Sequence, residues 1–330
     1  MAKGHTAQAL HRTISVDTST YLGIEKPERI REHLTINLSE HSFLPRIDDL
    51  QSDWVAHVAA PAFKAYRTQR DEHPVESFCS IGTGSGLDVL SAIELLGASR
   101  VGLTDVHEDV VAAAVSNVQR NHHLGQDVTI EAGFGDLLTP LSPYRAKYDV
   151  IYENLPNIPS SSTAVVASDR KSSDYVPPRI EQVPSLVKQQ MLDLHYLALM
   201  QAKSYLHHGG AVLSCLGARV PLGVFLELSE AAGYQPSFLI YGWKVQGDPE
   251  LIRDYATNEQ SGFGPFYFYR AETLQSTFLG LNPVDAGANA LEIERTLQTH
   301  RLDPAAAYAA FQCGERMAHT VVVLKSESIS

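Results

Sequence analysis

The sequence predicts an α/β fold built on a mostly parallel, doubly wound sheet. Two observations carry this prediction. Between residues 78 and 245, short apolar runs typical of buried strands alternate with stretches whose apolar residues recur at helical spacing. A glycine-rich turn also joins the first of these strands to the first helix, as in folds that bind nucleotides at the carboxyl ends of their strands. Right-handed crossovers through the helices then make neighbouring strands parallel.

We expect strands at residues 78–81, 101–105, 128–132, 148–156, 211–217 and 236–245, with two late strands at 266–271 and 319–325. Helices are expected at residues 87–96, 107–121, 186–205 and 222–232, with one or two covering helices within residues 285–316. The loop at residues 160–184 is rich in serine and proline and is long for a compact domain, which is typical of active-site lids and of disordered segments.

Residues 1–75 show a different pattern and are expected to be mostly helical. The stretch from Trp54 to Tyr66 places apolar side chains at helical spacing, and Pro45 and Pro74 mark breaks. We interpret residues 1–75 as an N-terminal helical cap or lid segment and residues 76–330 as the catalytic domain.

The charge balance excludes some classes of partner. The chain has 330 residues, with 26 Lys and Arg against 38 Asp and Glu, for a formal charge of −12. Proteins that bind nucleic acid or anionic membranes in general need a positive surface, and no Lys/Arg run exceeds a dipeptide here. The sequence therefore predicts a small-molecule substrate, and neither nucleic acid nor a membrane as a partner.

The cysteines and the N-terminus indicate a cytoplasmic setting. Cys79, Cys215 and Cys313 are far apart and odd in number, so they predict neither a disulfide framework nor a metal site. The N-terminus lacks the apolar stretch of a signal peptide, and no window of about 18 apolar residues predicts a membrane span.

The glycine-rich turn contains Gly82, Gly84 and Gly86, in the string Ser80-Ile-Gly-Thr-Gly-Ser-Gly. Glycines allow a sharp turn and let a ligand approach the backbone closely. The N-terminus of the following helix adds N–H groups that favour a carboxylate or a phosphate. A plain tight turn is the alternative interpretation.

Two acidic residues follow at the ends of the next two strands. Asp105 comes about twenty residues after the glycines, where a carboxylate can accept two hydrogen bonds from a ribose diol; its alternative role is the N-cap of the next helix. Asp136 can accept a hydrogen bond from the exocyclic amine of adenine, although a lone Gly-Asp pair also fits a turn. With the glycines, these residues predict nucleoside binding.

A polar amide stands at the end of the fourth strand, in the string Glu153-Asn-Leu-Pro-Asn157. Ligands of such sheets bind at the carboxyl ends of the strands. We therefore expect Asn154, close to two prolines, to be a rigid hydrogen-bond acceptor in the site.

Taken in this order, these features resemble the class I S-adenosylmethionine (SAM)-dependent methyltransferase superfamily, over about residues 76–245. The resemblance implies a Rossmann-like fold with a seven-stranded, mostly parallel sheet. It also implies SAM over the glycine turn, with the ribose on Asp105 and the adenine near Asp136. Asn154-Leu-Pro-Asn157 resembles the Asn-Pro-Pro-Tyr motif of amine and amide N-methyltransferases, in which the first residue accepts a hydrogen bond from the reacting nitrogen. The motif departs after Asn154, since Leu155 replaces the first proline and Asn157 the aromatic residue.

A narrower similarity covers residues 209–234 and the strings GWKV and GPFYFYRAE that follow. These resemble the N-terminal methyltransferase domain of plant methionine S-methyltransferase, which shares a Gly-x-Arg after the fifth strand and a helix ending in Ala-Gly-Tyr. Small bacterial relatives of this type include azetidine-2-carboxylate synthases, which cyclise SAM and release methylthioadenosine. Arg219, the last residue of the Gly-x-Arg element, fits either a pair with a carboxylate of substrate or SAM, or a surface ion pair.

Ser80 bears on the choice between methyl transfer and cyclisation. Methyltransferases of this fold usually carry Asp or Glu at this position, near the SAM ammonium. Without that anion the amine loses its proton more easily, and cyclisation requires a neutral amine as nucleophile. The alternative is that another residue or water replaces the contact.

The sequence thus predicts a SAM-dependent enzyme without a metal. The first hypothesis is closure of SAM to azetidine-2-carboxylate, with the SAM α-amine attacking its own γ-carbon. The second is methyl transfer to N or S of a small amino-acid-like acceptor, giving S-adenosylhomocysteine, and the third is a SAM-binding protein without catalysis. Aromatic faces stabilise a sulfonium, and the candidates are Tyr152, Tyr175 and the strand Phe266–Tyr269, most of which also fits ordinary sheet packing. The hydroxyl of Tyr175 is also a candidate for proton transfer.

Overall fold

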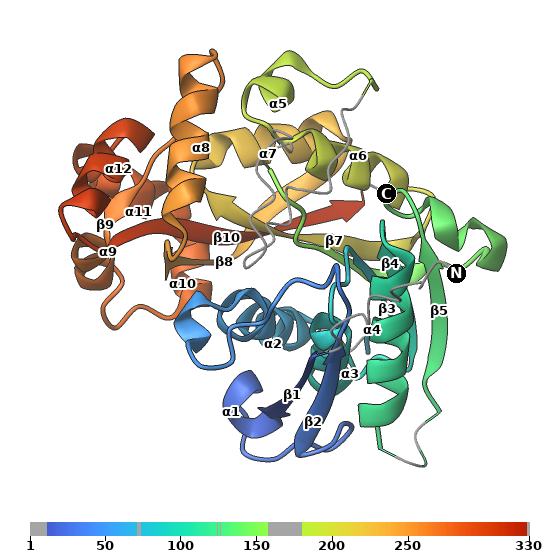
Figure 1. Ribbon diagram of the computed structural model, residues 1–330. Helices are drawn as coiled ribbons and strands as arrows, with labels where there is room; N and C mark the ends of the chain where they lie inside the picture. Colours follow the sequence, from blue (N-terminus) through green and yellow to red (C-terminus); the bar gives the residue numbers. More distant parts are fainter. Residues whose placement is uncertain (1–11, 71–73, 124, 126, 158–179, 329–330) are drawn as a thin grey trace, which may run out of the picture.

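An eight-stranded sheet forms the centre of the computed structural model, which describes residues 12–70, 74–123, 125, 127–157 and 180–328 (Figure 1). In spatial order, the strands are β5 (Thr129–Phe134), β4 (Arg100–Asp105), β3 (Ser77–Ile81), β6 (Tyr148–Glu153), β7 (Leu206–Ala218), β10 (Met317–Ser328) and β8 (Tyr234–Val245). The short β9 (Tyr269–Arg270) pairs with β10 outside this path.

The five strands from β5 to β7 in this order are parallel to one another, and β10 runs antiparallel to β7 and to β8. The predicted fold is thereby confirmed, because this order and the single reversed strand are those of the Rossmann-like class I methyltransferase fold. The late strand expected at residues 266–271 is reduced to the two-residue β9, and with it the sheet has eight strands rather than the seven that the resemblance implies.

Helices cover both faces of the sheet, which is why the central strands are continuous apolar runs. On one face lie α2 (Ala60–Gln69), α3 (Leu87–Leu95) and α4 (Glu108–Asn121), whose apolar side chains form one core cluster with the sheet. On the other face lie α5 (Ser185–Gln189), α6 (Asp193–Ala202), α7 (Leu222–Ala231) and α8 (Pro249–Gln260), which belong to a second cluster. Every residue of β3 is buried between the two layers.

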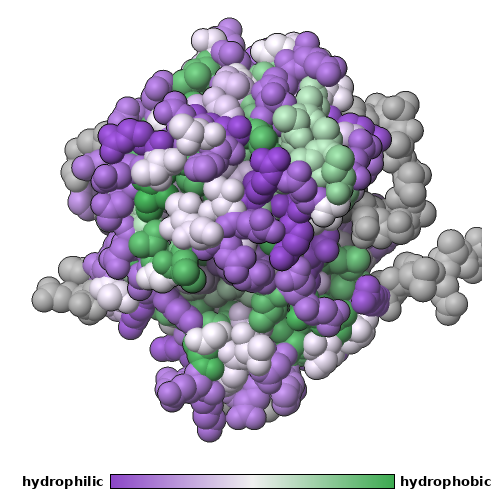
Figure 2. All heavy atoms as spheres, turned by 90° about the vertical axis from the view of Figure 1, so that its left-hand side faces the viewer, coloured by the Kyte–Doolittle hydropathy of each residue, from purple (hydrophilic) through white to green (hydrophobic). Residues whose placement is uncertain are grey.

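The C-terminal part adds α9 (Ala271–Thr277), α10 (Pro283–Ala288), α11 (Ala290–Leu297) and α12 (Pro304–Gln312) at the end of the sheet near β8 and β10 (Figure 1). Figure 2 shows this side of the molecule, where hydrophilic residues predominate and hydrophobic ones occur in separate small groups. Exposed apolar side chains near α10 and α11 are those of Leu279, Leu281, Val284 and Leu291.

The N-terminal segment differs from the expectation of a mostly helical cap. Residues Arg12–Asp17 (β1) and His33–Leu38 (β2) form a two-stranded antiparallel sheet, joined through the short α1 (Thr18–Leu22). The free edge of β2 is bonded by side-chain amides of α4: Asn121 bonds the backbone N–H and C=O of Thr35, and Asn117 those of Asn37. Local periodicity does not reveal such a partner, because it comes from residues about eighty positions away.

Two further elements differ from the sequence prediction. The single helix expected at residues 186–205 is two helices, α5 and α6, and Met191 between them has a positive φ of 55° that interrupts the helix. In addition, α8 was not predicted. Among the described residues, no helix is long and apolar enough to cross a membrane.

Candidate functional site

The glycine turn between β3 and α3 is built as the sequence predicts. Gly82, Gly84 and Gly86 have φ values of 69°, 52° and 79°, a left-handed conformation that other residues rarely adopt. A Cβ on Gly86 would lie 3.3 Å from Ala114 of α4, so this glycine allows two helices to pack closely. No atom of the described residues lies within 4 Å of the Cβ position of Gly84, apart from its two chain neighbours, which leaves space for a ligand over the turn.

Asp105 lies beside this turn. Its carboxylate accepts a hydrogen bond from Gly84 N at 3.3 Å and one from His107 N at 3.2 Å. Burial raises the pKa of Asp105, and the two backbone hydrogen bonds oppose that rise. Asp105 is not the N-cap of α4, since His107 holds that position. The structure thus brings the predicted glycines and the predicted ribose-binding carboxylate together.

Asp136 stands at the same edge of the sheet, after β5. Gln201 of α6 donates to its carboxylate at 3.2 Å, and the backbone N–H of Gly135 donates to the carbonyl of Asp105 at 2.8 Å. The loops after β4 and β5 are therefore adjacent, as a site for one nucleoside requires.

Ser80 is not isolated from negative charge. It donates a hydrogen bond to the carboxylate of Asp88, which lies in the first turn of α3 and is buried under the glycine turn. Thr83 Oγ and Val89 N donate to the other oxygen of Asp88, at 3.2 and 2.8 Å. Burial raises the pKa of Asp88 from 3.8 to about 6. A carboxylate thus lies beside Ser80, with both of its oxygens hydrogen-bonded inside the turn.

Asn154 and Leu155 lie next to the glycine turn. They follow β6, which pairs with β3, and a Cβ on Gly82 would lie 3.3 Å from Cδ2 of Leu155. Leu155, which replaces a proline of the family motif, therefore packs against the first glycine and holds the two loops together. Asn154 itself is half-buried at this edge.

A buried ion pair lies directly before Asn154 and was missed in the sequence. His195 of α6 places Nδ1 2.9 Å from both carboxylate oxygens of Glu153, and neither side chain is exposed. His195 Nε2 is 3.0 Å from Oδ1 of Asn157, and the backbone N–H of Leu155 donates to Glu153 at 3.1 Å. The pair thereby fixes both ends of the Asn154–Asn157 turn. A histidine forty-two residues away along the chain carries no spacing signal.

Tyr152 does not lie where a bound sulfonium would meet it, which corrects the sequence prediction. Its ring is buried in the core and lies edge-on to Phe63, at a centroid distance of 5.2 Å, and alongside Phe78 at 6.2 Å. The reason is its place in the chain: Tyr152 lies inside β6 (Tyr148–Glu153), where both faces of the sheet are covered, whereas Asn154 follows the end of the strand. Tyr175 and most of the predicted loop at residues 160–184 lie outside the described residues.

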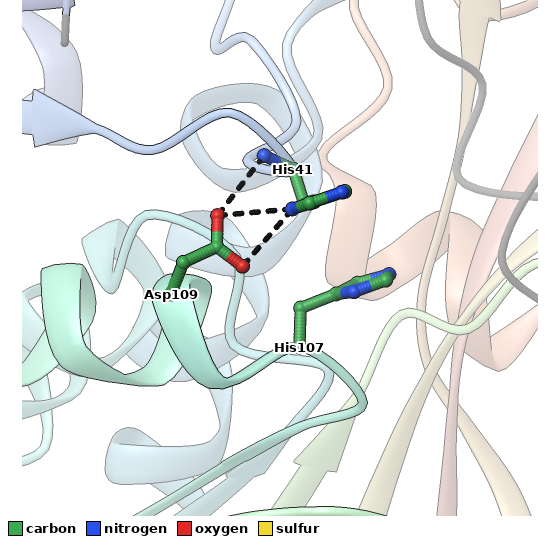
Figure 3. A group of neighbouring side chains, drawn as sticks. All are labelled: His41, His107 and Asp109. Atoms are coloured by element: carbon green, nitrogen blue, oxygen red, sulfur yellow. Dashed lines mark hydrogen bonds and ion pairs between the residues drawn. The ribbon is translucent and has the colours of Figure 1, made fainter. Parts of the chain in front are cut away.

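Two stacked histidines stand at the ribose end of the site (Figure 3). The rings of His41 and His107 are 4.4 Å apart and inclined by 7°, and Asp109 accepts from Nδ1 of His41 at 3.0 Å. One ligand atom from each of the three residues lies within 4.8 Å of the others. Parallel rings direct their nitrogen lone pairs side by side rather than to one point, so this arrangement fits stacking better than a tetrahedral metal site. It attaches the N-terminal segment to the end of β4.

The same segment also reaches the opposite end of the sheet edge. Lys244 of β8 donates to the carbonyl of Ser52, and its ammonium lies 5.3 Å from the ring centre of Trp54. His57 bonds the carbonyl of Trp243 at 2.9 Å. Residues 41–57 therefore contact the carboxyl ends of both β4 and β8.

Comparison with known proteins gives similar backbones only. No family model and no curated protein match this chain. A methyltransferase from Pyrococcus furiosus is 17% identical, with a TM-score of 0.37 over 54% of this chain and 75% of its own. The YcgJ protein from Bacillus subtilis is 11% identical, with a TM-score of 0.42 over 82% of this chain and 98% of its own. The cyclase SpnF is 11% identical, with a TM-score of 0.38 over 82% of each chain.

Sequence identities this low show a similar backbone only, and they do not indicate the reaction, because one fold hosts many reactions. The chain has the Rossmann-like class I methyltransferase fold by its own strand order.

Proposed function

We propose that this protein is a SAM-dependent enzyme whose nucleophile is an amine. The observation that carries the proposal is the convergence of three loops at one edge of the sheet. Gly84 contacts Asp105, and Gly82 contacts Leu155 beside Asn154. The open space over Gly84 fits a ligand that lies along the turn.

Each loop has a distinct part in this proposal. Asp105 accepts from the ribose hydroxyls and Asp136 from the adenine amine, while the sulfonium supplies an electrophilic carbon when SAM is bound. Asn154 accepts a hydrogen bond from the reacting amine and so orients its lone pair. The Glu153–His195 pair holds the Asn154–Asn157 turn rigid. Residues 41–57, which contact both ends of the edge, form the N-terminal wall of the site.

The first candidate reaction is closure of SAM to azetidine-2-carboxylate. The α-ammonium loses a proton, the neutral nitrogen bonds to the γ-carbon, and the carbon–sulfur bond breaks with its electron pair going to sulfur. The products are methylthioadenosine and the ring amino acid, with one proton released. Asp88 supports this candidate in one respect: its carboxylate is committed to Ser80, Thr83 and Val89, so it does not pair directly with the amine.

The second candidate is methyl transfer to the amine of a small amino-acid-like acceptor, giving S-adenosylhomocysteine. A specific observation favours it: Arg219 is a buried cation that no carboxylate of the described residues pairs with, which fits a second substrate carrying a carboxylate. Transfer to a thioether sulfur fits less well, because such a nucleophile carries no N–H for Asn154 to accept.

Product analysis tests the proposal. The purified protein is incubated with SAM, with and without a panel of small amino acids, and the products are separated by liquid chromatography and mass spectrometry. Methylthioadenosine formed with SAM alone supports the first candidate, and S-adenosylhomocysteine formed only with an added amino acid supports the second. SAM binding without any product contradicts both.

A further inference from the structure

A buried arginine stands one strand away from Asn154. Arg219 follows directly after β7, and only 6% of its surface is exposed. Its Nη2 donates to Oε1 of Gln246 at 2.7 Å and lies 3.0 Å from Nε2 of His319, while its Nε is buried and finds no hydrogen-bond partner among the described residues. The rings of Tyr255 and Phe268 lie 5.2 and 5.7 Å from the guanidinium carbon. The guanidinium therefore has donors to spare in an aromatic setting.

Nothing among the described residues neutralises this cation. No carboxylate of those residues lies within ion-pair distance of Arg219, although buried charges are normally paired. His319 carries no negative charge that could balance the guanidinium. Burial, together with the positive charges of Arg219 and Lys244, lowers the pKa of His319 well below its ordinary value. A neutral His319 accepts a hydrogen bond from the guanidinium without cancelling its charge.

A second cation lies close by. Lys244 of β8 is also buried, and burial lowers its pKa to about 8, with Arg219 contributing to the decrease and Asp53 opposing it. Asp53 is already occupied, since its carboxylate accepts from Tyr21 Oη at 2.8 Å and from three backbone N–H groups. The potential around Arg219 is therefore positive.

The strand is shaped to hold the guanidinium in place. A Cβ on Gly217 would overlap Nη1 of Arg219, so the side chain folds back over its own strand at a position that only glycine leaves open. This explains the Gly-x-Arg element of the sequence as one structural unit: the glycine makes room for the arginine.

The distance to Asn154 fits an α-amino acid. Strands β6 and β7 are paired with Glu153 opposite Ser214, so Gly217 lies one strand across from Asn154 and about two residues further along. Strand geometry puts the Cα atoms of Asn154 and Gly217 roughly 8 Å apart, and Nη1 of Arg219 lies against the Cβ position of Gly217. An α-amino acid with its amine on Asn154 and its carboxylate on Arg219 spans about this distance, when a hydrogen bond of about 3 Å is counted at each end.

We propose that Arg219, supported by His319 and Lys244, binds the carboxylate of the amino acid whose amine reacts. This inference rests on the proposed function for the identity of the amine. The carboxylate comes from SAM itself in cyclisation and from the acceptor in methyl transfer, and the arginine fork suits either.

Calorimetry with paired probes tests the site without turnover. SAM and decarboxylated SAM are titrated into the full chain as wild type and as R219Q. With S-adenosylhomocysteine at saturation, L-methionine and 3-(methylthio)propylamine are titrated in the same way. In one of the two pairs, we expect the wild type to bind the ligand with the carboxylate about tenfold or more tightly than the ligand without it. This preference should disappear in R219Q. The first pair reports the carboxylate of SAM, and the second that of an acceptor.

Two further variants keep the test independent of folding. G217A retains the arginine but displaces its guanidinium, so it should lose the same preference. R270Q removes an exposed arginine paired with Glu315 and should keep it. A preference that survives in R219Q and G217A, or that is missing from the wild type for both probe pairs, overturns the inference even if SAM is turned over. If SAM does not bind but the methionine preference depends on Arg219, the proposed function fails and the carboxylate site stands.

Discussion

Glu153, the residue before Asn154, is bonded by a histidine: Nδ1 of His195 lies 2.9 Å from its carboxylate oxygens, and neither side chain is exposed to solvent. The pair joins the end of β6 to α6, and through Asn157 and the backbone of Leu155 it holds the turn that carries Asn154. A residue that must aim a lone pair needs such support, because small displacements at a reacting centre reduce rates strongly.

Breaking this pair from one side is expected to be costly. H195L leaves a buried carboxylate without its partner, so the free energy of unfolding should fall by about 3–5 kcal/mol. The double variant E153Q/H195L removes both partners and should lose markedly less stability than the sum of the two single variants. Urea unfolding of the four proteins measures this coupling, and additive losses would show that the two side chains do not act as a pair.

Asp88 should make stability depend on pH. Its pKa rises from 3.8 in the unfolded chain to about 6 in the fold because of burial. Between these values the folded state binds more protons than the unfolded state, so the contribution of Asp88 decreases as the pH rises through this window and is fully lost above it. The decrease amounts to about 3 kcal/mol.

The D88N variant isolates this effect. We expect the stability of the wild type relative to D88N to decline between about pH 4 and pH 6, because only the wild type carries the titrating carboxyl. Chemical unfolding at a series of pH values measures the difference. A difference that does not change with pH would contradict the assignment.

Gly84 should be needed for the ligand more than for the fold. G84A places a methyl group in the open space over the turn and should weaken SAM binding at least tenfold, with a stability cost of about 1 kcal/mol from its positive φ. Gly209 is a matched control: its φ is 74°, no described residue beyond its chain neighbours lies within 4 Å of its Cβ position, and it precedes the buried part of β7. G209A should show the same stability cost and unchanged SAM affinity by calorimetry. Equal affinities in both variants would place the ligand elsewhere.

Asp105 should contribute directly to nucleoside affinity. D105A removes the carboxylate that in the proposed site accepts two ribose hydrogen bonds, so we expect a loss of about 1.5–3 kcal/mol, or roughly a tenfold to hundredfold loss of SAM affinity. D127A changes an exposed carboxylate of a loop and should bind SAM like the wild type. Titration of both variants with SAM and with S-adenosylhomocysteine checks this. Undiminished binding by D105A would remove the ribose assignment.

The sequence predicts much of this architecture because local patterns determine it. The strand–turn–helix units from Phe78 to Val245 have continuous apolar strands and helical periodicity, and Gly82, Gly84 and Asp105 occur at a spacing that the fold brings together. Where the backbone conformation itself needs glycine, residue type and structure coincide.

The parts that the sequence does not predict depend on partners far apart in the chain. The β1–β2 sheet is fixed by amides of α4, Glu153 is paired by His195, and Ser80 bonds the carboxylate of Asp88 eight residues later. Tyr152 was interpreted as a ligand contact because strand ends shift by a residue or two, and that shift decides whether a side chain meets the core or the site.

The most direct test of the account is to supply SAM labelled with nitrogen-15 in its α-amine, with no other amino acid, and to follow the label by mass spectrometry. Asn154 orienting the amine of SAM itself predicts that the label appears in azetidine-2-carboxylate, in equal amount to methylthioadenosine, and that N154A abolishes both products. Unchanged labelled SAM under these conditions, together with no S-adenosylhomocysteine when amino acids are added, would contradict an enzyme that acts on an amine at this site.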